Sequence, residues 1–144
     1  MGSRNVFITG ASSGIGKATA YKFAEHGDNL ILCARRKEKL NEIAQDLKNS
    51  WRCHVTIYEL DVTDYSAVEE VVNDLTKKGI KIDILVNNAG LASGLDKFQD
   101  SSIKDIEQMI NVNLKGLLYV TRKIISLMVE NNSGHIINLG STAG

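Results

Sequence analysis

The stretch from residue 6 to residue 16 decides the fold, and it reads Val6-Phe7-Ile8-Thr9-Gly10-Ala11-Ser12-Ser13-Gly14-Ile15-Gly16. A short apolar run leads into a turn with three glycines, and a helical pattern follows at once. This order is typical of a dinucleotide site, because glycine permits a tight turn, a close approach of the backbone to a pyrophosphate, and close packing of helix on strand. The N-terminus of the helix that follows also favours an anion.

The three glycines have the spacing Gly-x3-Gly-x-Gly, which differs from the commoner Gly-x-Gly-x-x-Gly. Alone it is a weak pattern, and a glycine-rich turn without a ligand is the alternative interpretation. In a strand–turn–helix context we nevertheless predict that this loop binds a nucleotide. The predicted cofactor-binding residues of the loop are Thr9, Gly10, Ser12, Ser13, Gly14, Ile15 and Gly16.

Outward from this loop, apolar runs alternate with segments of helical period. Because strands that are apolar on both faces and joined by helices indicate a parallel sheet covered on both sides, the pattern predicts an α/β fold with a doubly wound, Rossmann-type parallel sheet. No linker interrupts the chain, so we expect residues 1–144 to form a single dinucleotide-binding domain. The expected strands are 5–9, 29–34, 54–60, 82–88 and 135–139, and the expected helices are 15–26, 40–47, 68–75 and 102–131.

Composition excludes several classes of function. Seventeen Lys and Arg balance seventeen Asp and Glu, so no basic field attracts nucleic acid or anionic lipid. The longest apolar run, 30–34, is far shorter than the roughly twenty residues of a membrane span, and no signal peptide is recognisable. Cys33 and Cys53 lack metal-ligand spacing, as do the three histidines. We therefore expect a cytoplasmic protein with free thiols that binds neither nucleic acid, membrane nor metal.

Four motifs, in this order, resemble the short-chain dehydrogenase/reductase family. They are Thr9-Gly10-x3-Gly14-Ile15-Gly16, Asn87-Asn88-Ala89-Gly90, Asn111-Val112-Asn113-Leu114-Lys115-Gly116, and Ile137-Asn138-Leu139-Gly140-Ser141-Thr142-Ala143-Gly144. Residues 87–94 and the terminal motif also resemble the NADP-dependent 3-hydroxy acid (serine-type) dehydrogenase branch. The resemblance implies an oxidoreductase that transfers a hydride between NADP(H) and a hydroxyl or carbonyl group of a small-molecule substrate.

The end of the second strand indicates which nucleotide binds. An NAD site has an acidic residue there, which hydrogen-bonds the ribose hydroxyls, but this chain has Ala34, followed by Arg35 and Arg36. Arginine suits a phosphate, whereas a carboxylate would repel the 2′-phosphate. The alternative is that two arginines simply begin a solvated helix. We predict NADP(H) as cofactor, with Arg35 as the first candidate for the 2′-phosphate.

Two further segments are assigned to the nucleotide by resemblance. Asp61 matches the family position that contacts the adenine amino group, and Val62 is expected to pack on the ring. A turn aspartate that opens the next helix is an equally good interpretation of Asp61. In the segment Asn87-Asn88-Ala89-Gly90 the small pair Ala89-Gly90 leaves room for the adenosine ribose, while the asparagine part has a structural role and ties adjacent strands together.

The catalytic assignments also come from the resemblance. It implies that Ser141 hydrogen-bonds the substrate oxygen and that Asn113, in the long helix, holds a water that relays protons. A strand-end turn serine and an asparagine that merely bends the helix are the alternatives. The family's tyrosine and lysine would lie beyond Gly144. Tyr119-x3-Lys123 has their spacing, but it lies between Asn113 and Ser141, so we interpret it as coincidental.

The last strand and the long helix suggest missing partners. The strand 135–139 is apolar on both faces and would be a sheet edge if nothing followed, so we expect a C-terminally truncated chain that is inactive alone. A non-catalytic nucleotide-binding module remains the alternative. On the long helix, one apolar stripe is expected to cover the sheet, and Leu118 and Ile125 are left over, which predicts a homo-oligomer unless the rest of the chain covers them. The expected stripe is Ile106, Ile110, Leu117, Ile124 and Met128.

Overall fold

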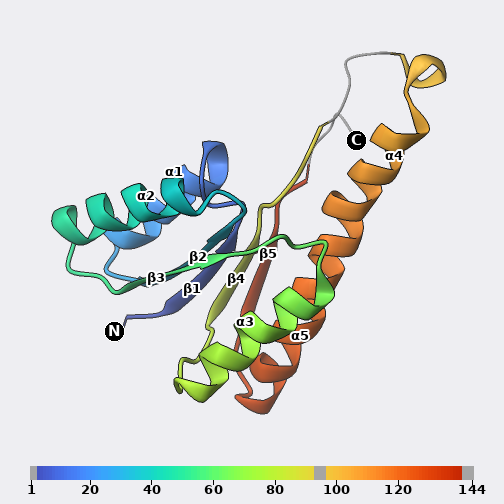
Figure 1. Ribbon diagram of the computed structural model, residues 1–144. Coiled ribbons are helices and arrows are strands. Elements are labelled where there is room, and N and C mark those ends of the chain that lie inside the picture. The colour runs from blue at the N-terminus through green and yellow to red at the C-terminus, as the bar shows by residue number, and fades with distance from the viewer. Residues whose placement is uncertain (1–2, 93–96, 141–144) are drawn as a thin grey trace.

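The computed structural model describes residues 3–92 and 97–140. Five strands form one parallel sheet in the order β3-β2-β1-β4-β5 (Figure 1). The order reverses beside β1, because the chain first builds outward through β2 and β3 and then crosses to β4 and β5. The strands are β1 (Asn5–Thr9), β2 (Asn29–Ala34), β3 (Val55–Glu59), β4 (Ile84–Asn87) and β5 (His135–Asn138).

Helices cover both faces of the sheet (Figure 1). On one face lie α1 (Gly14–Glu25) and α2 (Lys37–Ser50). On the other lie α3 (Tyr65–Lys77) and α5 (Leu117–Glu130), which contact each other. The predicted doubly wound α/β fold is confirmed, and its strand order places a switch point between β1 and β4.

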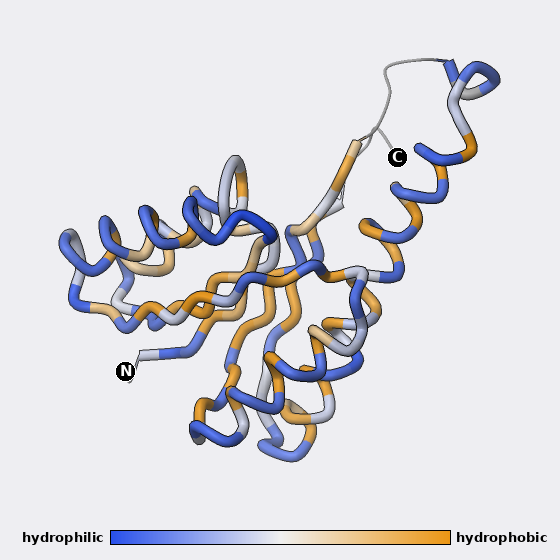
Figure 2. Tube along the Cα trace, viewed as in Figure 1, coloured by the Kyte–Doolittle hydropathy of each residue, from blue (hydrophilic) through white to orange (hydrophobic). Residues whose placement is uncertain are grey.

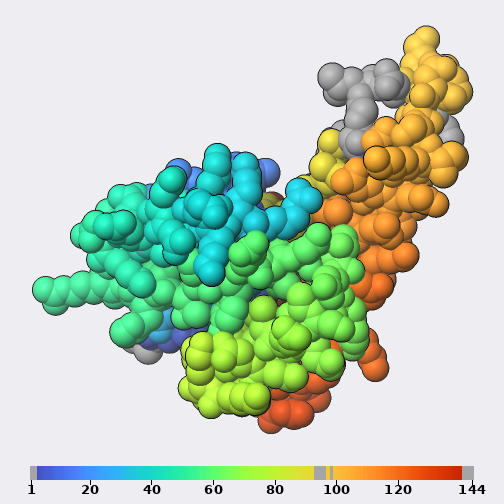
Figure 3. Space-filling view, viewed as in Figure 1, coloured from blue at the N-terminus to red at the C-terminus, as the bar shows by residue number. Residues whose placement is uncertain are grey.

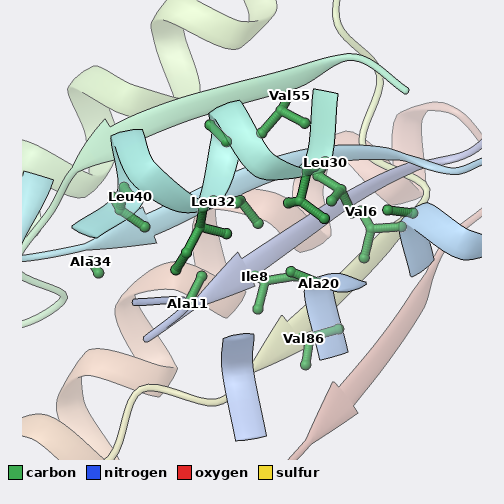
Figure 4. Packing of buried hydrophobic residues seen from close by; sticks show 14 of the residues in the cluster. Val6, Ile8, Ala11, Ala20, Leu30, Leu32, Ala34, Leu40, Val55 and Val86 are labelled. Carbon is green, nitrogen blue, oxygen red and sulfur yellow. The ribbon is translucent and has the colours of Figure 1, made fainter. Parts of the chain in front are cut away.

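Alternation along β1 explains the two cores. Val6 and Ile8 point to the α1/α2 side, where Figure 4 shows them with Leu30 and Leu32 of β2. Phe7 points to the opposite side, toward α3 and α5. Successive strand side chains face opposite sides of a sheet, so a strand buried on both faces must be apolar throughout. Figure 2 accordingly shows continuous hydrophobic tracts along the central strands and alternating ones on the helices.

The helix ends follow the local signals of the sequence. Gly27 and Gly79 have φ of 81° and 68°, the left-handed conformation that ends a helix with a glycine. Asp64 caps α3 by accepting a hydrogen bond from the backbone N–H of Ala67. Ser102 caps the long helix in the same way, accepting from the backbone N–H of Asp105 at 3.1 Å.

The long helix is not uniform. After a short 3₁₀ turn, η1 (Phe98–Asp100), it comprises α4 (Ile103–Met109), the π-helical segment η2 (Ile110–Gly116) and α5. A wider π turn changes the phase of the side chains that follow it. A constant helical period therefore does not describe the whole of this helix.

The expected stripe is wrong in its first half. Ile124 and Met128 are buried as predicted, but Ile110 is 47% exposed and α4 buries none of its residues. Figure 3 shows this part of the helix standing out from the body of the molecule. Leu118 and Ile125 are exposed as expected. The large apolar side chains that are exposed on the long helix are Ile103, Ile110, Leu114, Leu118, Ile125 and Val129.

The structure also describes the two cysteines and the length of the helices. Cys33 is buried and Cys53 half-buried, both as free thiols. Across the described ranges, no helix combines the length and apolar character needed to span a bilayer.

One buried carboxylate ties the start of β1 to the loop before β2. Asp28 is 3% exposed and accepts three hydrogen bonds from Arg4, one from the backbone N–H and two from the guanidinium. We expect Asp28→Ala to lower the free energy of unfolding by about 1.5 kcal/mol, the scale of hydrogen bonds to a charged group. Urea unfolding of the whole protein measures this change.

The same contact makes a pH prediction. The hydrogen bonds from Arg4 hold the pKa of Asp28 below its ordinary value. Its stabilisation is therefore present above the unfolded-state pKa, near pH 4, and is lost as the pH falls through the lower folded-state pKa. The destabilisation by Asp28→Ala should shrink in acid. Glu25→Gln, which breaks an exposed pair with Lys22, should have no measurable effect; an equal effect of both variants would contradict the prediction.

Candidate functional site

A cleft of about 560 Å³ lies at the carboxyl ends of the strands. Open α/β sheets bind ligands in this position, at the switch point, and the volume lies in the range of small-molecule sites. Its walls come from the glycine loop, the segments after β2, β3 and β4, and the long helix. The lining residues are Gly10, Ser12, Ser13, Ile15, Ala34, Arg35, Arg36, Leu60, Asp61, Val62, Asn88, Ala89, Gly90, Leu91 and Val112.

The glycine loop requires glycine for two different reasons. Gly10 has φ of 63°, and a Cβ there would lie 2.8 Å from the Cα of Ala89. A Cβ on Gly16 would lie 2.4 Å from the carbonyl oxygen of Gly10. Gly14 has φ of 54° but faces open space. Close approach thus constrains the first and third glycines, and backbone conformation constrains the first and second.

Thr9 and Asn88 lock this loop to the end of β4. The Thr9 hydroxyl oxygen accepts hydrogen bonds from the backbone N–H groups of Asn88 and Ala89, at 3.0 and 2.9 Å. The Asn88 amide donates to the carbonyl oxygens of Thr9 and Gly10, both at 3.0 Å. Thr9 is buried and does not line the cleft. In this structure its hydroxyl therefore positions the glycine loop from the buried side, away from the cleft.

Asn87 makes a second lock beneath the cleft. Its amide donates to the Thr121 hydroxyl on α5 at 2.9 Å and to the Asn138 side-chain oxygen on β5 at 2.8 Å. Asn87 is 4% exposed. The structural role expected for the asparagines of the second motif is therefore divided: Asn87 joins β4 to β5 and α5, and Asn88 joins β4 to the glycine loop.

The two arginines after β2 face the cleft differently. Arg36 donates from Nη2 to the hydroxyls of Ser12 and Ser13, at 3.0 and 2.9 Å, and so bridges to the glycine loop. Arg35 lines the cleft beside it. Among the described residues that line the cleft, Asp61 is the one carboxylate, so Ala34 leaves the end of β2 without an acid. This corner of the cleft is cationic.

Asp61 has the turn role that the sequence suggests and also lies at the cleft, where the other interpretation places it. Its Oδ1 accepts hydrogen bonds from the backbone N–H and the hydroxyl of Thr63, at 2.9 and 2.7 Å, which is a turn role. It also lines the cleft next to Val62. Burial raises its pKa, but the two hydrogen bonds from Thr63 and the charge of Arg35 outweigh burial, so the pKa lies below its ordinary value. The carboxylate is ionised at neutral pH.

Asn113 lies in the π-helical segment and clamps the chain after β4. Its Oδ1 accepts from the backbone N–H of Leu91 at 2.7 Å, and its Nδ2 donates to the Leu91 carbonyl at 2.8 Å. Leu91 lines the cleft, whereas Asn113 does not. The interrupted helix agrees with the alternative that this asparagine sits at a distortion, and π segments occur frequently at functional sites. Ser141, the other predicted catalytic residue, lies outside the described residues.

Tyr119 and Lys123 face α3 and do not line the cleft. Lys123 forms an ion pair with Glu69 of α3, and the Tyr119 ring packs edge-on against Tyr65 with centroids 5.2 Å apart. This placement supports the interpretation that their family-like spacing is coincidental.

Four residues that line the cleft were not predicted to bind the cofactor: Ala34, Leu60, Leu91 and Val112. Each directly adjoins a predicted site residue, and this adjacency was the available signal. Two glycines that were predicted to bind the cofactor do not line the cleft. Gly14 and Gly16, like Thr9, shape the loop without lining the cleft. The described ranges hold no cluster of three or more His, Cys, Asp or Glu able to bind a metal ion.

A glycine loop at the switch point of a doubly wound parallel sheet defines the dinucleotide-binding class of α/β proteins. The family model described as short chain dehydrogenase matches residues 4–144, and the chain belongs to this family.

Several individual proteins are also similar to this chain. The chain is 45% identical over 139 residues to the NADP-dependent 3-hydroxy acid dehydrogenase YdfG of Escherichia coli O157:H7, covering 96% of this chain and 54% of that protein. It is 44% identical over 140 residues to sulfoacetaldehyde reductase 2 of Chromohalobacter salexigens, covering 96% and 55%. The closed form of a serine dehydrogenase complexed with NADP⁺ superposes with a TM-score of 0.87 at 43% identity, covering 97% and 55%. The chain spans about half the length of the curated relatives it matches.

Proposed function

We propose that the whole protein is an NADP(H)-dependent oxidoreductase of the short-chain dehydrogenase type. The observation that carries the proposal is the cationic corner of the cleft, where β2 ends in Ala34 and Arg35 and Arg36 follow. An NAD site would hold a carboxylate at this point. Relatives named as NADP-dependent and a structural neighbour complexed with NADP⁺ support the same cofactor.

The residues of the cleft fit this cofactor. The glycine loop presents backbone to a pyrophosphate, and Arg35 and Arg36 offer guanidinium donors to a 2′-phosphate. Asp61 and Val62 bound the adenine end, while Ala89 and Gly90 leave space for the ribose. When bound, the nicotinamide donates or accepts the hydride; this chain binds and orients it.

Catalysis requires a proton donor beside the hydride transfer. We assign Ser141 to hold the substrate oxygen and Asn113 to hold a water in a proton relay. A tyrosine, assisted by a lysine, would act as the general acid and base from a segment after residue 144, as the family resemblance implies. Residues 1–144 would then form a single dinucleotide-binding domain that is inactive without that segment. Location in the cytoplasm is part of the proposal, supported by the free thiols.

The substrate class that we propose is a small 3-hydroxy acid, or the oxo acid formed from it. The name of the 45% identical relative supports this class, and the name of another relative adds sulfoacetaldehyde as a second candidate. Both candidates carry a small anionic group together with a carbonyl group that can accept a hydride, or with the hydroxyl-bearing carbon that can give one up. The experiment is a steady-state assay of the whole protein with NADPH or NADH and with each oxo compound.

Three results separate the possibilities. Turnover with NADPH and a 3-oxo acid supports the proposal, and turnover with sulfoacetaldehyde alone replaces the substrate class. Tight NADPH binding with no turnover of any carbonyl compound would favour the alternative of a non-catalytic nucleotide-binding module. The sequence of the whole protein separates these two functions before any assay: a tyrosine and a lysine after Ser141 favour an enzyme, and their absence favours a non-catalytic module.

We also propose that the whole protein is a homo-oligomer that covers the exposed apolar side chains of the long helix. Leu114 and Leu118 are 54% and 52% exposed there, one helical turn apart. We expect Leu118→Glu to shift the protein toward monomer, because a charge buried without a partner opposes association. Light scattering at micromolar concentration measures the mass, with Lys104→Glu, an exposed change on α4, as the matched control. A wild type that is already monomeric would contradict the proposal.

A further inference from the structure

The end of the π-helical segment touches the adenine side of the cleft through a glycine. Gly116 is buried, and a Cβ built on it would lie 2.5 Å from Cγ2 of Val62, 3.1 Å from its Cβ and 3.4 Å from its carbonyl oxygen. Real Cβ atoms essentially never approach another heavy atom to less than 3.0 Å. The helix can therefore reach this distance from Val62 only with glycine at position 116.

Val62 is in contact with two different parts of the molecule. It is 7% exposed and belongs to the buried cluster beneath α3 and α5, together with Leu60 and Val68. It also lines the cleft, next to Asp61. The long helix itself contributes Val112, four residues before Gly116, to the same cleft. The Gly116–Val62 contact thus sets the distance between two walls of the nucleotide site.

We propose that Gly116 is a positioning residue for the nucleotide: by admitting Val62 against the helix backbone it sets the width of the adenine end of the cleft. The inference rests on the proposed NADP(H) function, and it concerns a residue that touches neither the cleft nor the nucleotide itself. Gly116 acts on the nucleotide site only through the position of Val62.

A methyl group at position 116 has few ways to be accommodated. Valine has a restricted χ1, and rotation moves Cγ2 while leaving the Cβ of Val62 in place. The core around Val62 is close-packed and does not yield easily. The valine can therefore relax into the cleft, or the helix can move outward together with Val112. Either movement changes the wall on which the adenine would pack.

The test uses the whole protein and two probes, NADPH and adenosine 2′,5′-bisphosphate, which carries adenine and the 2′-phosphate but no nicotinamide. Titration calorimetry gives the affinity of wild type, Gly116→Ala, Val62→Ala and the double variant. We expect Gly116→Ala to bind both probes about tenfold more weakly, the scale of an overpacked contact. The double variant should bind nearly as Val62→Ala does, because removing Cγ2 relieves the 2.5 Å contact and leaves only the 3.1 Å contact with the Cβ at position 62, which a shift of a few tenths of an ångström accommodates. Lys115→Ala, an exposed neighbouring change, is the matched control and should bind as wild type.

The outcomes distinguish a positioning role from general damage. Alanine is the better helix former, so the substitution itself does not weaken the helix. Equal binding by wild type and Gly116→Ala, or a loss confined to NADPH, would overturn the inference. If Gly116→Ala fails to fold, the double variant decides: folding and binding like Val62→Ala support the inference, and any other result overturns it. A wild type that binds neither probe would overturn the proposed nucleotide function itself, which the wild-type titration reveals separately.

Discussion

Gly16→Ala is expected to lower the free energy of unfolding by about 3 kcal/mol, at the upper end of the usual range for overpacking, and to abolish nucleotide binding. A Cβ at this position would lie 2.4 Å from the carbonyl oxygen of Gly10 and 2.3 Å from the amide nitrogen of Asn88. That amide nitrogen is the donor that holds the glycine loop, through hydrogen bonds to Thr9 and Gly10. The methyl group would therefore separate the loop from β4. Urea unfolding and NADPH titration of the whole protein measure the two effects.

Gly14→Ala is the matched control. Gly14 also has a positive φ, of 54°, but a Cβ there meets nothing within 4 Å. Alanine at this position pays only the left-handed backbone strain, about 1–2 kcal/mol. Equal destabilisation by the two substitutions would show that strain and not close packing governs the loop, and would contradict the prediction.

Arg35→Ala is expected to weaken NADP⁺ binding by about 1.5–3 kcal/mol, the scale of hydrogen bonds to a charged group, while NAD⁺ binding stays nearly constant. The reason is that a guanidinium contact to the 2′-phosphate exists in one cofactor and not in the other. Titration of both nucleotides against wild type and variant measures the change. Equal affinity of the wild type for NAD⁺ and NADP⁺ would sink the prediction.

Two neighbouring variants locate the effect. Lys37→Ala removes an exposed charge at the start of α2, which does not line the cleft, and should change neither affinity appreciably. Arg36→Ala removes the guanidinium that donates to Ser12 and Ser13. A larger loss of NADP⁺ affinity with Arg36→Ala than with Arg35→Ala would move the principal phosphate contact from the first arginine to the second.

The order of strands and helices was predictable because it depends on residues close together in the chain. The apolar run 29–34 corresponds to β2 without correction, and Gly27 and Gly79 mark helix ends through their own backbone conformation. Ser102 caps the long helix three residues before its hydrogen-bond donor. The main failure was the first half of the stripe on that helix, because α4 buries none of its residues and nothing in the hydrophobic pattern indicates that this part of the helix stands out from the body of the molecule.

The sequence by itself determined the doubly wound class of the sheet, the glycine loop at its switch point and the cationic segment after β2, since each follows from local pattern. Only the tertiary structure decided how these parts hold one another. Thr9 meets Asn88 across 79 positions of the chain because β1 pairs with β4, and Arg36 reaches Ser12 because β2 lies on the other side of β1. Gly116 meets Val62 because the long helix packs against the segment that follows β3. Such contacts depend on strand order and helix placement, which no local spacing of residues contains.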